Sequence, residues 1–208
     1  MGVMAADEPV ERVFQALCDG RLTRDDLTAR KLAAFLGQTT MVLYHHYGSL
    51  DGFLIRVDGA GWRMLAEGLE ARARGGADAR ALAVYYVEFA LRRPDLYWLM
   101  AERRFDRARL RDEGRLRLAR PLWGAFVGLL GRYGSARPAE DTHVLFAGLH
   151  GIAMLTLSGR ANLGEDPAAD HEVAFAAARR LADLVLPPRP AEPPAPPANE
   201  GCGLRRGC

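Results

Sequence analysis

Apolar residues recur along most of the chain at spacings of three and four, which is typical of α-helices, while the alternating pattern of β-strands is almost absent. Near the start, Val10, Val13, Phe14 and Leu17 fall on one helical face, and Gly20 interrupts the pattern. The sequence therefore predicts an all-α protein with about nine helices. The predicted helical segments lie at residues 9–19, 28–36, 39–47, 50–74, 77–92, 95–106, 107–118, 121–133, 138–160 and 168–186.

Prolines, glycines and one serine mark the boundaries of these segments. Gly37 directly follows segment 28–36, as a helix end favours, and Ser49 is a good N-cap for the long segment after it. Five prolines stand where a helical pattern begins, namely Pro9, Pro94, Pro121, Pro138 and Pro167. Seven more lie between Pro187 and Pro197, where the apolar periodicity has ended. We therefore predict a small helical domain at 1–58, a larger one at 59–186 and a disordered Pro-rich tail at 187–208.

Residues 27–54, LTARKLAAFLGQTTMVLYHHYGSLDGFL, contain two short helical segments joined through a glycine turn, the arrangement of a helix-turn-helix. Leu32, Phe35, Leu36 and Leu43 supply an inner face that can pack on the first helix. The second short helix is then free to enter a DNA major groove with its N-terminal residues facing the base edges.

The residue types on this second helix suit DNA. Six candidates lie at its start or on its outer face: Gln38, Thr39, Thr40, Met41, Tyr44 and His45. Glutamine can pair with adenine, and threonine or methionine methyl groups can contact the methyl of thymine. Thr28, Tyr44 and His46 are placed for phosphate contacts. The alternative is a plain helical hairpin in which Tyr44 is a core aromatic and both histidines are merely solvated.

The same stretch resembles the TetR family of bacterial transcriptional regulators. The matching pieces are LT at 27–28, LAAFLG at 32–37, LYHHYGS at 43–49 and DGFL at 51–54, within about the first 58 residues. The resemblance implies a homodimeric, ligand-controlled repressor with an N-terminal DNA-binding domain. Two shorter stretches, 92–100 and 149–155, resemble the C-terminal domain of one subgroup of that family.

The chain also departs from the family's pattern. Members usually carry a phosphate-contacting lysine directly after the serine at this position, whereas this chain has Leu50. The second short helix contains no lysine or arginine, and residues 1–58 hold six cations against eight acids. Because phosphate attraction supplies most non-specific affinity, we expect modest DNA affinity with a shallow salt dependence.

The larger predicted domain is rich in aromatic residues that could enclose an apolar ligand cavity between helices. Nine residues are the candidates for its lining: Tyr86, Phe89, Trp98, Met100, Trp123, Phe126, Phe146, His150 and Met154. The alternative for any one of them is ordinary core packing. A ligand cavity is favoured because a DNA-binding module joined to a larger helical domain needs a signal to sense.

Two late segments carry features of a dimer interface. Small residues on segment 138–160 allow close helix approach, and segment 168–186 presents an apolar stripe. We expect an intersubunit four-helix bundle that includes Ala147, Gly151, Ala177, Leu181 and Leu184. Packing within one chain is the alternative. A two-fold dimer would read a palindromic operator.

Two other features allow competing interpretations. His143 and His150 share a helix face, but neither has a cysteine or acid at metal-ligand spacing nor a nucleophile at catalytic spacing. We therefore expect no metal site and no enzyme. Eight arginines between Glu102 and Arg120 suggest a solvated face laced with ion pairs, or else the entrance for an anionic or acyl-thioester ligand.

Composition narrows the remaining classes. The chain is 49% hydrophobic, and 28 Lys plus Arg against 26 Asp plus Glu give a net charge of +2, which neither favours nor excludes a nucleic-acid partner. There is no apolar run of 18 residues for a membrane span and no basic-then-apolar secretory leader. Cys18, Cys202 and Cys208 are too few for a disulfide framework, so we expect a cytoplasmic protein.

Taken together, the sequence predicts a ligand-responsive transcriptional regulator, most simply a repressor. It would bind a palindromic double-stranded DNA operator as a homodimer, without a cofactor, and leave it when a small hydrophobic effector binds. The competing hypotheses are a helical interaction protein that has lost DNA binding, and a histidine-dependent enzyme.

Overall fold

The computed structural model describes residues 8–105, 115–160 and 167–186. These residues form nine α-helices and one short 3₁₀-helix, and within the described ranges no strand occurs. The all-α prediction is therefore confirmed. The elements are α1 (Glu8–Cys18), η1 (Arg24–Asp26), α2 (Ala29–Leu36), α3 (Thr40–Tyr47), α4 (Leu50–Arg74), α5 (Ala79–Arg92), α6 (Pro94–Ala101), α8 (Arg115–Arg132), α9 (Pro138–Leu157) and α10 (Pro167–Val185).

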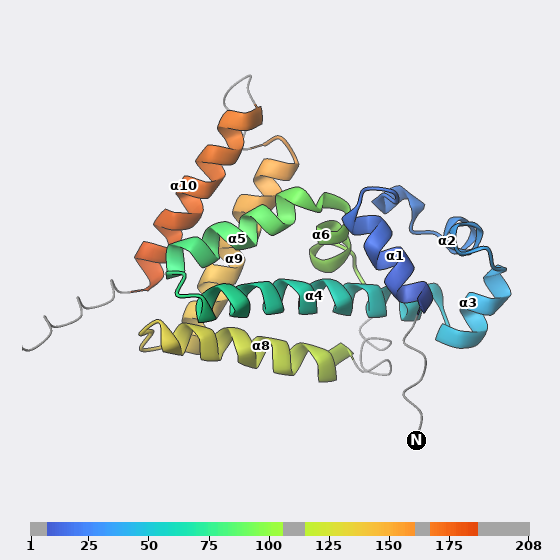
Figure 1. The fold of residues 1–208 in the computed structure, drawn as a ribbon, viewed down its shortest axis with the longest axis horizontal. Coiled ribbons are helices and arrows are strands. Elements are labelled where there is room, and N and C mark those ends of the chain that lie inside the picture. Colours follow the sequence, from blue (N-terminus) through green and yellow to red (C-terminus); the bar gives the residue numbers. More distant parts are fainter. Residues whose placement is uncertain (1–7, 106–114, 161–166, 187–208) are drawn as a thin grey trace, which may run out of the picture.

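Helices α1 to α3 form a small group at one end of the molecule, with α3 at its outer edge (Figure 1). The predicted inner face of α1 is confirmed, because Val10, Val13, Phe14 and Leu17 are all buried. Thr28 caps α2 through its hydroxyl oxygen, which accepts the Lys31 backbone N–H at 3.4 Å. Gly37 ends α2 with φ 68°, a left-handed conformation that glycine adopts without strain.

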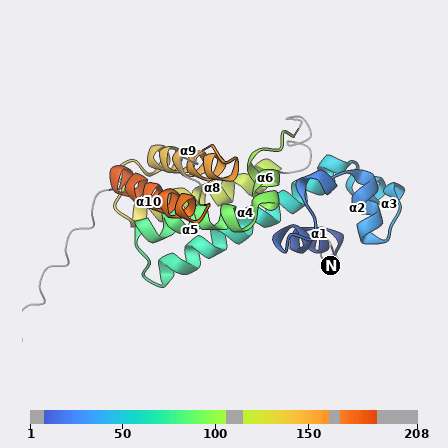
Figure 2. The ribbon, with the colours of Figure 1, turned by 90° about the horizontal axis from the view of Figure 1, so that it is seen from above.

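Helix α4 runs from this small group into the larger group of helices (Figures 1 and 2). Its N-terminus is capped as predicted, with the Ser49 hydroxyl oxygen accepting the Gly52 N–H at 2.9 Å. Its buried residues extend from Gly52 to Leu69. One helix therefore belongs to the core at both ends of the molecule, and it continues past residue 58, as the predicted segment 50–74 does.

Glycines in α4 permit close contacts with its neighbours. A methyl group at Gly61 would lie 2.5 Å from the sulfur of Met100 and 3.2 Å from Leu96, both on α6. A methyl group at Gly68 would overlap the hydroxyl of Tyr85 on α5. Glycine lowers helix propensity at these sites, but it lets neighbouring helices approach the α4 backbone.

The larger group packs α5 against α9 and α10, and α8 against α4 and α9. Viewed from above, α9 and α10 lie along one side of the molecule, away from α1 to α3 (Figure 2). The described helices include none that is both long enough and apolar enough to cross a membrane.

Two predicted boundaries were wrong, and one element was missed. The 3₁₀-helix η1 was not predicted, and α6 ends at Ala101 instead of residue 106. Pro121 was expected to begin a helix but lies inside α8, where it is exposed. Of the predicted helix 107–118, the part before residue 115 lies outside the described residues, as does the predicted tail from residue 187.

Replacing Gly61 with alanine is expected to lower the free energy of unfolding by about 1–3 kcal/mol, because the new methyl group must displace Met100 and Leu96 from a packed contact. Urea unfolding followed by circular dichroism measures this change. The matched control is Gly124→Ala on α8, where no atom lies within 4 Å and the better helix propensity should add about 0.5–1 kcal/mol. Equal unfolding midpoints for the two variants would contradict the packing argument.

Candidate nucleic-acid interface and effector pocket

Helix α3 fully buries one side chain, Leu43, half-buries Val42 and Tyr47, and turns its other side chains outward. Met41 is 76% exposed and Tyr44 is 48% exposed, although both are large and largely apolar. All eight predicted DNA-contacting residues are exposed: Thr28, Gln38, Thr39, Thr40, Met41, Tyr44, His45 and His46. A helix with this exposure can enter a groove without rearranging its own core.

The joint between α3 and α4 explains why α3 is nevertheless fixed in place. The Tyr47 ring, half-buried, meets the Phe53 ring edge to face at 4.9 Å between centroids. The Arg56 guanidinium lies over the Tyr47 ring, 5.2 Å from its centroid. Tyr47 is therefore part of the joint between α3 and α4.

The cations near α3 are largely engaged within the protein. Lys31 is 2.9 Å from the carboxylate of Asp26, whose pKa is lowered to about 2 by the Thr23 backbone N–H and by Lys31 itself. Arg21 pairs with Asp19 at 3.0 Å. Arg12 donates to the last carbonyls of α2 at 3.4 and 3.5 Å. These contacts leave little positive charge for DNA phosphates.

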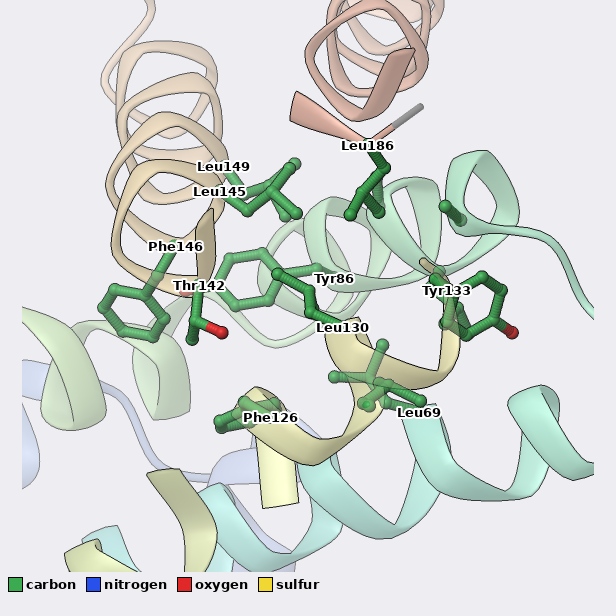
Figure 3. A pocket seen from close by; sticks show the side chains of 14 residues that line it. Leu69, Tyr86, Phe126, Leu130, Tyr133, Thr142, Leu145, Phe146, Leu149 and Leu186 are labelled. Atoms are coloured by element: carbon green, nitrogen blue, oxygen red, sulfur yellow. The ribbon is translucent and has the colours of Figure 1, made fainter. Parts of the chain in front are cut away.

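An apolar pocket lies among α4, α5, α8 and α9, with the end of α10 above it (Figure 3). Its cavity volume is about 70 Å³, and the space among the lining residues continues into open solvent. The lining residues are Leu69, Ala79, Leu82, Ala83, Tyr86, Phe126, Leu129, Leu130, Tyr133, Thr142, Leu145, Phe146, Leu149 and Leu186. The apolar walls suit a small hydrophobic molecule.

Three of the nine residues predicted for a cavity lie in this wall, namely Tyr86, Phe126 and Phe146. The structure places the other six outside it: Phe89, Trp98, Met100, Trp123, His150 and Met154. Phe89 and Met100 are buried in the core, and Met100 packs on Gly61. Trp123 does not line the pocket, but its ring lies next to that of the lining residue Phe146, with 6.0 Å between the two ring centroids. None of the seven leucines in the wall was predicted, because leucine recurs in the core pattern of every helix and does not distinguish a pocket from ordinary packing.

A chain of hydrogen bonds leads away from the pocket wall. The Tyr86 and Tyr97 hydroxyls are 3.0 Å apart, and the Tyr97 hydroxyl is 2.9 Å from Nδ1 of His150. Nε2 of His150 is 3.1 Å from a carboxylate oxygen of Glu102. Burial raises the pKa of both tyrosine hydroxyls well above the ordinary value, so they remain neutral donors and acceptors.

Glu102 is followed in sequence by a residue that contacts the first turn of α4, next to the small group of helices α1 to α3. The neighbouring Arg103 forms an ion pair with Asp51, in the first turn of α4, at 3.1 Å. At the other end of α6, the Asp95 carboxylate accepts the Arg24 backbone N–H of η1 at 2.8 Å. The two groups of helices are therefore connected by α6 and the turn after it as well as by α4.

The last two described helices carry exposed apolar residues. On α9, Val144, Ala147, Gly151 and Leu155 recur at spacings of three and four, and all are exposed or half-buried. On α10, Val173 and Leu184 are 63% and 66% exposed. Leu181, by contrast, packs on Gly148 of the same chain, and Ala177 is half-buried.

Comparison with known proteins agrees with this architecture. The family profile described as "Tetracyclin repressor-like, C-terminal domain" matches residues 79–181. The crystal structure of a protein provisionally designated the regulatory protein SCO4313 superposes with a TM-score of 0.56 at 18% sequence identity, covering 81% of this chain and 96% of that one. A comparison with curated proteins gives no match.

The chain thus has the fold of a helical regulator, and over residues 79–181 it matches the C-terminal domain of the TetR family. The match runs from α5 through α6, α8 and α9 to most of α10, and the first 58 residues, which resemble the family's helix-turn-helix, lie outside it. The protein is therefore a transcriptional regulator.

Replacing Tyr97 with phenylalanine is expected to lower the free energy of unfolding by about 1–3 kcal/mol, because it removes the partner of two groups, the Tyr86 hydroxyl and Nδ1 of His150. Thermal unfolding measures the change. Tyr85→Phe is the control, because its half-buried ring lies under the Arg72 guanidinium and phenylalanine keeps that contact. If both variants unfold alike, the chain of hydrogen bonds contributes nothing to stability.

Proposed function

We propose that this regulator is a ligand-responsive repressor that binds a palindromic DNA operator as a homodimer and is released by a small hydrophobic effector. The observation that carries the proposal is the exposed surface of α3, a short helix that Leu43 and Tyr47 fix to the rest of the protein and that presents Met41 and Tyr44 to solvent. Exposing two such residues on one helix is costly unless a partner covers them.

The exposed residues of α3 match the chemistry of a major groove. Gln38 and Thr39 precede the helix and Thr40 begins it, so they would meet base edges first. Thr28 is exposed at the start of α2, where free backbone N–H groups favour a phosphate. His45 and His46 lie in the last turn of α3 and would reach the sugar–phosphate backbone. We assign DNA binding to residues 1–58 on this basis.

We assign effector binding and dimerisation to residues 59–186. The apolar pocket supports the first assignment. The exposed apolar residues on α9 and α10 support the second, since a second copy would cover Ala147, Gly151 and Leu184. Two-fold symmetry then places two copies of α3 for the two halves of a palindrome.

Effector control requires that the effector bind one arrangement of the dimer more tightly than the other. Helices α4 and α6 contact both groups of helices, so a shift at the pocket wall changes the position of α3 relative to its partner copy. Coupling of this kind is reciprocal, and operator DNA will weaken effector binding by the same factor.

Replacing Tyr44 or Thr40 with alanine is expected to weaken operator binding by about tenfold or more, because each loses contacts made only with DNA. Gel shifts on duplexes selected from a random library, and on the DNA flanking the chain's own gene, measure the affinity. Glu67→Ala, an exposed change on α4, is the control and should bind as the unaltered protein does.

Two outcomes would overturn this proposal. One is the absence of any specific shift at low salt without effector, which would favour a helical interaction protein that does not bind DNA. The other is a monomer in sedimentation experiments under binding conditions, because a single copy of α3 cannot read a palindrome.

Operator binding is also expected to depend less steeply on salt than that of a strongly basic domain. Residues 1–58 hold six cations, of which Arg12, Arg21 and Lys31 are engaged within the protein, so at most three per protomer, or about six per dimer, are left for DNA phosphates. The slope of log K against log salt should therefore be no steeper than about −6. Gel shifts between 50 and 200 mM salt measure it, and a slope near −10 would show that the ion pairs open on DNA.

A further inference from the structure

The wall of the apolar pocket contains no charged side chain and only three hydroxyls. Eleven of its fourteen lining residues are leucine, alanine or phenylalanine, and the others are Tyr86, Tyr133 and Thr142. Whatever polar recognition a ligand receives from side chains must therefore come from these three oxygens. The question is whether they offer hydrogen atoms or lone pairs.

Two of the hydroxyls have already donated their hydrogen. Thr142 is 3% exposed, and its hydroxyl donates to the Pro138 carbonyl at 2.6 Å. The Tyr133 hydroxyl donates to the Ala77 carbonyl. A carbonyl oxygen can only accept, so the direction of both hydrogen bonds is certain.

The hydrogen of Tyr86 is committed as well. The ionised carboxylate of Glu102 only accepts, so Nε2 of His150 is the donor in that contact. Nδ1 of a neutral imidazole then accepts from Tyr97, and the Tyr97 oxygen in turn accepts from Tyr86. With neutral His150, none of the three lining hydroxyls has a hydrogen left for a ligand.

Of the three hydroxyls, the one on Thr142 is placed to accept a hydrogen bond from a ligand. Figure 3 shows its hydroxyl oxygen turned toward the space that Leu130 and Phe126 border, whereas the Tyr133 oxygen points away from the other lining residues. Tyr86 directs its hydroxyl to Tyr97, which is not a lining residue. The Thr142 oxygen keeps unused lone pairs after donating to Pro138.

We propose that this pocket selects an uncharged, mostly hydrocarbon ligand with one hydrogen-bond donor, a hydroxyl or N–H group, which the Thr142 oxygen accepts. The inference deepens the proposed function, since it takes this pocket as the effector site. A carboxylate would lose its hydration without gaining a donor or a cation, and an ether or ketone oxygen would stay unsatisfied. Alcohols and phenols are therefore preferred over the matching ethers, ketones and acids.

Three ligands that share a 4-propylphenyl core and differ in one polar group test this selection: 4-propylphenol, 4-propylanisole and 4-propylbenzoate. Each is titrated into the full-length protein by calorimetry, without DNA, at about pH 8, where an imidazole is ordinarily neutral. We expect the phenol to bind about fivefold more tightly than the anisole, as one neutral hydrogen bond allows. The benzoate should bind more weakly than both.

Two threonine variants isolate the acceptor. Thr142→Val keeps the branched shape but removes the oxygen, so the phenol should lose its advantage over the anisole. Thr156→Val is the matched control, because Thr156 lies on the same helix, donates to the Ile152 carbonyl at 2.9 Å in the same way, and does not line the pocket. It should keep the preference, and Thr142→Ser, which retains an oxygen, should keep it too.

The proposal is overturned if the benzoate binds as tightly as the phenol, if none of the three ligands binds, or if Thr142→Val leaves the phenol-to-anisole ratio unchanged while its thermal unfolding is native-like. A gel shift with and without the phenol separates this result from the proposed function. Binding with the expected selectivity but no effect on DNA would disprove the effector role and leave the ligand class standing.

Discussion

The contact of α6 across the glycine at position 61 of α4 is the constraint on which the arrangement of the molecule depends. Because Gly61 has no side chain, Met100 and Leu96 can pack directly on the α4 backbone. Helix α6 is thereby held where it also contacts α1 and η1, and Asp95 accepts a hydrogen bond from Arg24. The distance and angle between α3 and the pocket are set at this crossing, not by a flexible linker.

The pocket and its surroundings divide their polar groups in a consistent way. The walls are hydrocarbon, and the hydroxyls among them give their hydrogens to carbonyls or to the chain through Tyr97 and His150. An unsatisfied polar group in such a wall would cost about 1–3 kcal/mol, so the arrangement stabilises the unliganded protein. Because these hydrogens are already donated, the side chains of the pocket wall offer a ligand hydrogen-bond acceptors but no donors. A cavity with few polar groups can in this way still distinguish between ligands.

The α3 surface is an unusual DNA-binding candidate because it offers shape and hydrogen bonds with little charge. In the proposed function an effector must overcome the operator affinity, and an α3 without lysine or arginine lowers the non-specific part of that affinity. The internal ion pairs of Lys31 and Arg21 act in the same direction. In the proposed dimer, selectivity would depend on base contacts from Gln38 to Tyr44 and on the spacing of the two protomers.

Local sequence patterns determined the helices, the helix-turn-helix at 27–54, the buried face of α1 and the caps at Thr28 and Ser49, because each depends on residues within a few positions of one another. The tertiary structure alone decided which residues line the pocket. Phe89 and Met100 are as apolar as Phe126 and Phe146, but α5 and α6 turn them into the core. It also decided that α8 continues through Pro121 and that Tyr97 meets His150 across 53 residues. Periodicity specifies which face of a helix is apolar, whereas the neighbour that covers that face is chosen by packing between distant segments.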